Sequence, residues 1–315
     1  MKRFKRILFV ARDIPGIEGL LKTAVALAER NQARLTVAGM LGERPQKLEI
    51  LTRIEVDDFW DLVAREKTQE LEALVAPFLG RNVEIRTELL AGIPFLEITR
   101  QALRDECDLV VMPADGDGEN SGTLFGSLSM HLMRKCPCPV WLLKPTRRHS
   151  WSRVLAAVDP AVDSSHPDTL SQTIVELAIS LAETQKAELH VVHAWTVFAE
   201  RIFRKSARLS RAEVTALMRE VEHDHRARVQ MILRDGNRKP VKCHLHIEKG
   251  DAGIVIPQIA RTLRADVVVM GTVARTGVAG FLMGSTAETI LRQLHCSVLA
   301  VKPSGFVTPV QLAGD

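Results

Sequence analysis

The residues best suited to hold an anionic ligand lie in one glycine-rich segment, Gly271–Leu294. Glycines let the backbone approach a ligand and adopt positive φ, and the N–H groups at a helix start favour negative charge. Gly271 and Gly284 frame the segment, and Ser285 and Thr286 add hydroxyl donors where a helix is predicted to begin. The segment therefore predicts a phosphate-binding loop. It is neither a Walker A loop nor a Rossmann fingerprint, because Gly-Lys-Ser/Thr is absent and the glycine spacing differs.

A purely structural interpretation of this segment stays open. The two framing glycines could be turn residues only, with Ser285 or Thr286 as the N-cap of the helix. An enzyme would need further chemistry. The chain shows no Ser-His-Asp or Cys-His arrangement with supporting context, and no carboxylate pair typical of glycoside hydrolysis. We therefore favour binding over catalysis.

Histidine and cysteine pairs offer further candidates. His244 and His246 share one face of a predicted strand and could chelate zinc, but a solvated strand face is the favoured interpretation. Cys136-Pro-Cys138 lacks the Cys-x-x-Cys redox spacing, so we expect small packed residues there. His225 lies two positions from the other histidine of its predicted helix, so these two do not face one ligand.

The elements that must position these residues occur twice in the chain. VWLLKP at Val140–Pro145 returns as VLAVKP at Val298–Pro303, 158 residues later, and this offset holds without a gap from Val83 to Pro145. The two starts align at a shorter offset of 147, which indicates an 11-residue insertion in the second copy, between Trp195 and Pro240. An internal repeat of this length indicates one fold used twice.

Each copy alternates Val/Ile/Leu-rich runs with segments of helical period. This pattern is typical of a parallel sheet covered by helices on both faces. The predicted fold class is α/β, as two tandem copies of a five-stranded, parallel, doubly wound domain, residues 1–148 and 149–315, with the boundary near Thr146–Trp151. Such sheets bind ligands at the carboxyl ends of strands where the strand order reverses, here after Val158 and Met270.

The composition excludes several classes of protein. A formal charge of +4 is too small for a general polyanion binder, and 4% aromatic residues without any Tyr are too few to stack single-stranded bases. No apolar run approaches the ~18–20 residues of a membrane span. Five sparse cysteines fit a reduced chain. We therefore expect a cytoplasmic protein with no membrane span and no specific nucleic-acid partner.

The whole chain resembles the universal stress protein family in its tandem form, and within it the E subgroup. The signs are the duplicated unit, the block GTVARTGVAGFLMGSTAETILRQLHC, the first-copy block LMRKCPCPVWLLKP and the tail VKPSGFVTPVQL. The resemblance implies Rossmann-like domains of the adenine nucleotide alpha hydrolase type, paired as a pseudo-dimer through Val140–Leu143 and Val298–Val301. It also implies a binding and signalling role in stress resistance, with a slow ATPase switch as the alternative. The sequence leaves open whether two chains form a homodimer.

Nucleotide-binding members of that family carry Gly-x2-Gly-x9-Gly-Ser/Thr after the fourth strand. Gly271, Gly284 and Ser285 fit this spacing, whereas Ala274 takes the place of the second glycine. The resemblance therefore implies that the second copy binds ATP or a related adenine nucleotide, accompanied by Mg, and that this loop and Thr286 hold the phosphates. The methyl group of Ala274 would shift the loop or remove a positive-φ conformation. A lipid-like or metabolite ligand is the alternative.

The resemblance also implies a carboxylate beside the adenine, at the end of the first strand. Asp159 fits this position in the second copy, although it could equally cap the turn at Pro160. The first copy has Arg12 there, with Asp13 next in the chain. The first copy thus departs from the nucleotide pattern where the second copy keeps it.

The loop of the first copy that corresponds to the predicted phosphate loop also departs from the nucleotide-binding pattern. Pro113 stands at the first glycine position, with a fixed φ and no N–H. Three carboxylates beside a triphosphate would repel it. We therefore expect this site to be degenerate for ATP, or adapted to another ligand or a cation. The other matching positions are Gly116, Gly126 and Ser127, and the carboxylates are Asp115, Asp117 and Glu119.

Overall fold

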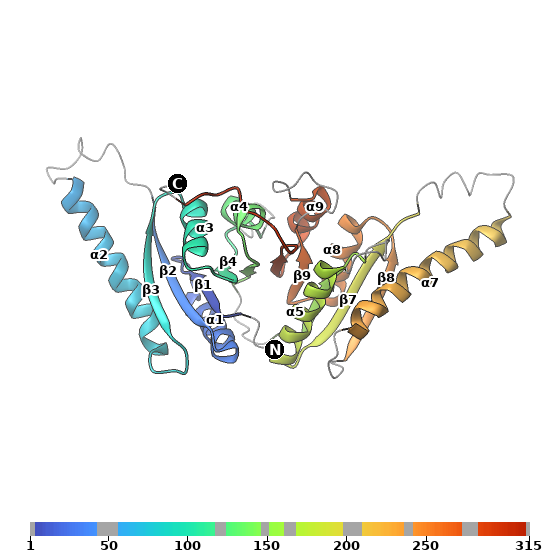
Figure 1. The fold of residues 1–315 in the computed structure, drawn as a ribbon, viewed down its shortest axis with the longest axis horizontal. Helices are drawn as coiled ribbons and strands as arrows, with labels where there is room; N and C mark the ends of the chain where they lie inside the picture. The colour runs from blue at the N-terminus through green and yellow to red at the C-terminus, as the bar shows by residue number, and fades with distance from the viewer. Residues whose placement is uncertain are drawn as a thin grey trace. The chain divides into compact units, whose positions relative to one another are not determined.

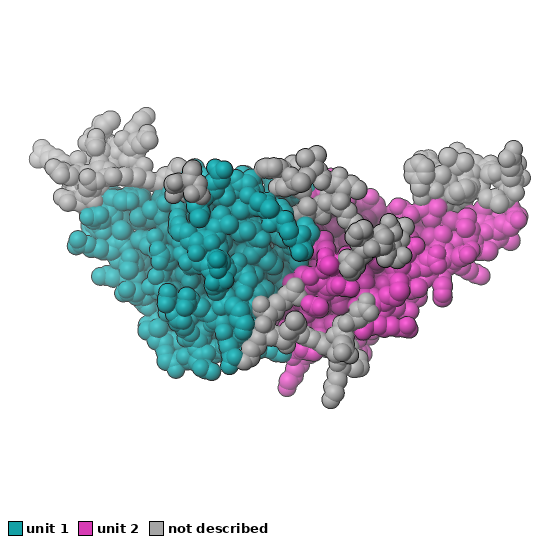
Figure 2. Space-filling model, viewed as in Figure 1, with its two compact units in different colours: residues 1–149, 274–283, 297–315 teal, residues 150–273, 284–296 magenta. Residues whose placement is uncertain are grey.

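The computed structural model describes residues 4–42, 56–116, 124–145, 151–160, 168–197, 210–235, 242–272 and 283–312. The chain divides into two compact units, which Figure 2 draws in different colours. Unit 1 comprises Met1–His149, Ala274–Met283 and Ser297–Asp315, and unit 2 comprises Ser150–Val273 and Gly284–Cys296. The last strand of the chain is thus grouped with unit 1. The domain limits predicted from the repeat, 1–148 and 149–315, stay a prediction.

Unit 1 is built on a parallel sheet of order β3-β2-β1-β4-β5, which the antiparallel strand β10 extends (Figure 1). The strand order reverses between β1 and β4. Its elements are β1 (Arg6–Val10), α1 (Ile17–Asn31), β2 (Arg34–Gly42), α2 (Val56–Val75), the 3-10 helix η2 (Ala76–Phe78), β3 (Ile85–Ala91), α3 (Pro94–Arg104), β4 (Leu109–Pro113), α4 (Ser127–Lys135), β5 (Val140–Leu143) and β10 (Ser297–Val301).

Unit 2 repeats the arrangement with parallel strands of order β9-β6-β7-β8. Here the strand order reverses between β6 and β9. Its elements are β6 (Arg153–Ala157), α5 (Thr169–Gln185), β7 (Glu188–Trp195), α7 (Arg211–Asp235), β8 (Cys243–Lys249), α8 (Ala252–Leu263), β9 (Val267–Gly271) and α9 (Ser285–Gln293).

Helices cover the strands in layers. Right-handed crossovers place the helices before and after the reversal on opposite faces of a sheet. Accordingly α3 packs on α4 in unit 1, and α8 packs on α9 while α5 packs on α7 in unit 2. The strands between these layers are apolar, and β4 and β10 are buried along their whole length. Each strand ends where this apolar layer ends. In a doubly wound sheet a ligand binds just beyond the carboxyl ends of the strands, so the layer also sets where a ligand can bind.

The doubly wound parallel α/β architecture predicted from the sequence is confirmed. So is the pairing of the two final strands, because β5 and β10 pair antiparallel through Trp141↔Leu299 and its neighbours. Strand β3 begins at Ile85 and β8 at Cys243, where their ladders to β2 and β7 start. None of the helices in the described ranges has the length and apolar character needed to cross a bilayer.

Candidate functional site

The predicted site residues of the second copy lie after two neighbouring strands of unit 2. Strands β6 and β9 pair with Ala157 opposite Met270, so their carboxyl ends lie side by side. Asp159 follows β6 with its side chain 75% exposed, and Gly271 is the last residue of β9. Gly284 donates its N–H to the carbonyl of Thr272, 3.0 Å away, which ties the start of α9 to the end of β9. Ala274 lies outside the described residues.

The two framing glycines of this loop, Gly271 and Gly284, do not use positive φ. Gly284 has φ −62° and is the N-cap of α9, so neither following hydroxyl residue takes that position. Gly271 is not among the positive-φ glycines of the described residues. A Cβ at Gly271 would lie 3.0 Å from the Cδ2 of Leu170 on α5. The expected positive-φ role is therefore wrong for these two glycines.

The start of α9 can accept an anion. Ser285 and Thr286 are its first two residues, and both are exposed. Within the described ranges, no side chain bonds to their N–H groups. These groups carry the partial positive charge of the helix start. Glu288 also lies in this turn, but its carboxylate pairs with Arg292 at 2.8 Å.

Two histidines lie beside Asp159, of which the sequence reasoning missed His193. His193 on β7 is 2% exposed, and its Nδ1 lies 3.1 Å from the carbonyl of Val158 and 3.9 Å from an Asp159 oxygen. Because a carbonyl only accepts, the proton of neutral His193 sits on Nδ1, and Nε2 accepts from Nδ1 of His225, 2.8 Å away. Burial lowers the pKa of His225, which favours this neutral pair. The ring of His225 also stacks on Trp195.

In unit 1 a carboxylate of the chain itself occupies the corresponding helix start. Asp115 accepts hydrogen bonds from the backbone N–H groups of Gly126, Leu128 and Ser129 at 2.9–3.3 Å. A Cβ at Gly126 would lie 2.8 Å from both the main-chain and a side-chain oxygen of Asp115, so the glycine permits this approach. Asp115 thus takes the donors that a phosphate would need, which is a more direct exclusion than charge repulsion. The other two carboxylates of this loop, Asp117 and Glu119, lie outside the described residues.

The rest of the first-copy pattern also differs from unit 2. Pro113 closes β4 and pairs with Leu143, where unit 2 ends β9 with a glycine. Arg12 and Asp13 follow β1 at the edge of a cavity of about 780 Å³. Most of the lining is apolar, and a Lys67–Glu70 ion pair of 2.7 Å lies at its border. Lining residues include Ile17, Met40, Leu71, Leu74, Pro94 and Leu128.

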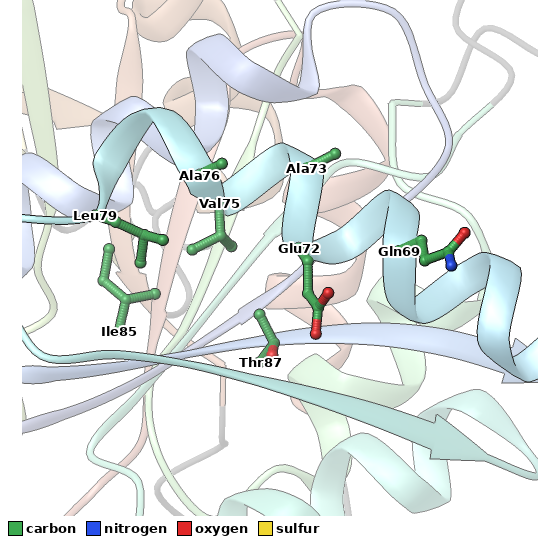
Figure 3. A pocket seen from close by; sticks show the side chains of 8 residues that line it. All are labelled: Gln69, Glu72, Ala73, Val75, Ala76, Leu79, Ile85 and Thr87. Atoms are coloured by element: carbon green, nitrogen blue, oxygen red, sulfur yellow. The ribbon is translucent and has the colours of Figure 1, made fainter.

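A second groove of unit 1, about 590 Å³, lies between α2 and the edge strand β3. Figure 3 shows Leu79 and Ile85 facing each other in it, with Glu72 directed toward Thr87. It contains none of the residues predicted to bind a ligand. The groove and the cavity beside Arg12 share Ala73 of α2 as a lining residue.

The histidine pair of β8 has a third member. His190 on β7, 5% exposed, lies with its Nδ1 3.0 Å from Nε2 of His246 and stacks on the ring of His244. His244 and His246 are half-buried, so the strand face that was predicted to be solvated is only partly exposed. In the described part of the chain, no three His, Cys, Asp or Glu residues are arranged to hold a metal.

The fold and the two unequal crevices define a protein of tandem α/β domains. The model of the universal stress protein family matches residues 3–144 and again residues 150–302. The chain therefore belongs to the universal stress protein family, with two copies of its domain. This membership supports a role in the stress response.

Individual relatives agree with this assignment. The chain is similar to universal stress protein E of Escherichia coli (strain K12), with 31% identity over 79% of this chain and 78% of the relative. It is 24% identical to universal stress protein E of Photorhabdus laumondii over the full length of both. A solved structure of a functionally unknown protein from Pseudomonas aeruginosa PAO1 matches with a TM-score of 0.66 and 26% identity, over 96% of this chain and 94% of that one.

Proposed function

We propose that unit 2 binds ATP or a related adenine nucleotide after β6 and β9, in a binding and signalling role without efficient turnover. The N–H groups and hydroxyls of Ser285 and Thr286 would receive the phosphates, and Asp159 would meet the base or ribose. One observation carries the proposal. At the start of α4 Asp115 bonds to three N–H groups, including that of Leu128, whereas the matching N–H of Thr286 on α9 faces no side chain of the described residues.

A magnesium ion would accompany the nucleotide. Mg²⁺ is commonly held by substrate phosphates and water with only one or two protein carboxylates. Asp159 is the exposed carboxylate nearest the proposed position of the adenine base. No residue of the described crevice stands out as a general base that would activate water for hydrolysis. The proposal is therefore a binding site rather than an ATPase centre.

The experiment is calorimetric titration of the full chain with ATP and magnesium. Gly284→Glu brings a carboxylate to the phosphate position and is expected to abolish binding. Ser285→Ala removes one donor and is expected to weaken binding about tenfold, the effect of a lost hydrogen bond to a charged group. Ser127→Ala, at the matching position of α4, is the control and should leave the affinity unchanged.

Three outcomes separate the alternatives. No measurable binding by the intact chain at millimolar ATP would overturn the nucleotide proposal. Equal weakening by Ser127→Ala and Ser285→Ala would move the site away from α9. Steady phosphate release that Gly284→Glu abolishes would instead support the slow ATPase switch.

A second candidate function concerns unit 1, which would hold a lipid-like or metabolite ligand. Its support is the cavity of about 780 Å³ with a largely apolar lining and Arg12 at its edge. Asp115 already occupies N–H groups at the nearby start of α4, so this helix start is closed to phosphate. Mass spectrometry of small molecules carried through native purification tests this candidate. A ligand lost in Leu71→Trp, which would fill the cavity, supports it, and a chain that carries no small molecule contradicts it.

A further inference from the structure

Two cysteines of unit 1 lie close together at the junction of α4 and β5. Cys136 ends α4 as its C-cap, and Cys138 lies two residues later, beyond Pro137. Their sulfur atoms are 3.7 Å apart, and the residues are 0% and 6% exposed. The chain between them is short, so only a small side-chain movement separates this contact from a covalent bond.

A buried lysine acts on the same pair. Lys302, the residue after β10, is 8% exposed, and its Nζ donates to the carbonyl of Met133. Burial lowers the pKa of Lys302 to about 8, against the opposing effect of the two sulfur atoms. At neutral pH most of this amine therefore carries a proton and supplies positive charge beside the thiols.

Cys136 differs from an ordinary buried cysteine, whereas the hydrogen bond to Cys136 and burial raise the pKa of Cys138. The pKa of Cys136 is lowered because Cys138 donates a hydrogen bond to its sulfur, with the Lys302 charge acting in the same direction. Burial raises the pKa of Cys107 to about 12. The thiolate is the reactive form of cysteine. Cys136 is therefore the nucleophile of the cluster, and Cys138 is placed to resolve it.

We propose that Cys136 and Cys138 form a reversible dithiol–disulfide site that hydrogen peroxide oxidises. This inference is independent of nucleotide binding in unit 2. The pair is enclosed, so a bulky disulfide reagent is excluded and the oxidant would have to be a small neutral molecule such as hydrogen peroxide. The bond would lock the junction between α4 and β5, next to the pairing of β5 with β10.

The chemistry proceeds in two balanced steps. The Cys136 thiolate attacks one peroxide oxygen, so an S–O bond forms and the O–O bond breaks, and the released hydroxide takes up a proton as water. The Cys138 sulfur then attacks the sulfenic acid, so the S–S bond forms and the S–O bond breaks with loss of a second water. Two thiols are oxidised and one peroxide is reduced. A dithiol reductant reverses the result by thiol–disulfide exchange.

The test is peroxide treatment of the full chain, followed by denaturation, alkylation and mass spectrometry. The expected product has lost the mass of two hydrogen atoms, resists alkylation at Cys136 and Cys138, and regains both thiols with dithiothreitol. The bulky reagent dithiobis(nitrobenzoate) should react with exposed Cys243 and spare the pair. A pair that stays fully alkylatable while Cys243 alone is oxidised would overturn the proposal.

Variants test the separate roles. Cys138→Ser should stop the reaction at a Cys136 sulfenic acid, which dimedone traps when the oxidised chain is denatured in its presence, and Cys107→Ser should leave the disulfide unchanged. Lys302→Met should slow oxidation about tenfold, as one unit of pKa change in the thiol would, and Lys302→Arg should restore the rate. Unchanged oxidation in Lys302→Met, together with no dimedone adduct in Cys138→Ser, would remove Cys136 as the nucleophile.

Discussion

The starts of α4 and α9 are the same element of the repeat, yet they differ in one decisive respect. At α4 the carboxylate of Asp115 bonds to three backbone N–H groups. At α9 the matching N–H of Gly284 donates to the carbonyl of Thr272, and the described residues place no side chain on the N–H groups of Thr286 and Ala287. The residue that matches Asp115 in the repeat is Val273, which has no group to offer them. Among the described residues, Asp115 thus distinguishes the start of α4 from that of α9.

The ends of β1 and β6 differ in the same sense. Arg12 stands in unit 1 where Asp159 stands in unit 2. The polar surroundings diverge too, because unit 2 adds His193 and His225 beside its carboxylate. The duplication therefore conserved the apolar layer that folds each unit, while the strand ends acquired separate chemistry.

The largest expected effect comes from removing the carboxylate that caps the start of α4. Asp115→Ala leaves the N–H groups of Gly126, Leu128 and Ser129 without their acceptor. Loss of such a cap costs about 1–2 kcal/mol. Urea unfolding followed by amide exchange in α4 measures the loss, and Asp115→Asn, which keeps one acceptor oxygen, should lose less. Unchanged protection of α4 in Asp115→Ala would show that the cap is unimportant.

A smaller effect is expected from making the end of β9 more like that of β4. Gly271→Ala puts a methyl group 3.0 Å from Leu170. Because that contact is with the flexible end of a side chain, we expect a cost of about 1 kcal/mol. The double variant with Leu170→Ala should show no further cost from the added methyl. Equal costs in both backgrounds would mean that the strain lies elsewhere.

The two units should also respond differently to acid. Burial lowers the pKa of His190, His225 and His246 in unit 2, and of His131 in unit 1. The unfolded chain therefore binds protons more readily than the folded chain below the ordinary value of 6.5. Folding stability consequently falls as the pH drops below that value, and it falls more for unit 2.

Amide exchange in β7 and β1 as a function of pH measures this difference. His246→Asn should flatten the pH dependence of β7 and leave that of β1 unchanged. Parallel losses of protection in the two strands would contradict the assignment of acid sensitivity to the histidines of unit 2.

The smallest expected effect is a gain of weak anion binding in unit 1. With Asp115→Ala, inorganic phosphate should shift the amide resonances of Leu128 and Ser129, because their N–H groups are released. The wild-type chain should show no such shift. Equal responses of the two proteins would mean that Asp115 does not exclude phosphate from α4.

Much of the fold was predictable from the residues. The constant offset between Val83 and Pro145 and their counterparts required two copies of one fold. Alternating apolar runs indicated parallel strands covered by helices, which the pairings confirm. Local patterns report burial well because each strand of such a sheet is apolar along its length.

The site was predictable only in part. The helix start at Ser285 follows from its glycine and hydroxyl neighbours, and it is observed. His193 was hidden in an apolar run, and its partner His225 lies 32 residues further along the chain. No local pattern reports a contact over that separation.

By itself the sequence determined the repeat, the alternation of strands and helices, and the residue types at each strand end, because these depend on local patterning. The tertiary structure alone decided which of those residues meet. It brought Asp115 onto α4, His225 onto His193, and Lys302 into the surroundings of Cys136 and Cys138. These contacts depend on packing between segments far apart in the chain, which burial and hydrogen bonding fix only when the layers assemble.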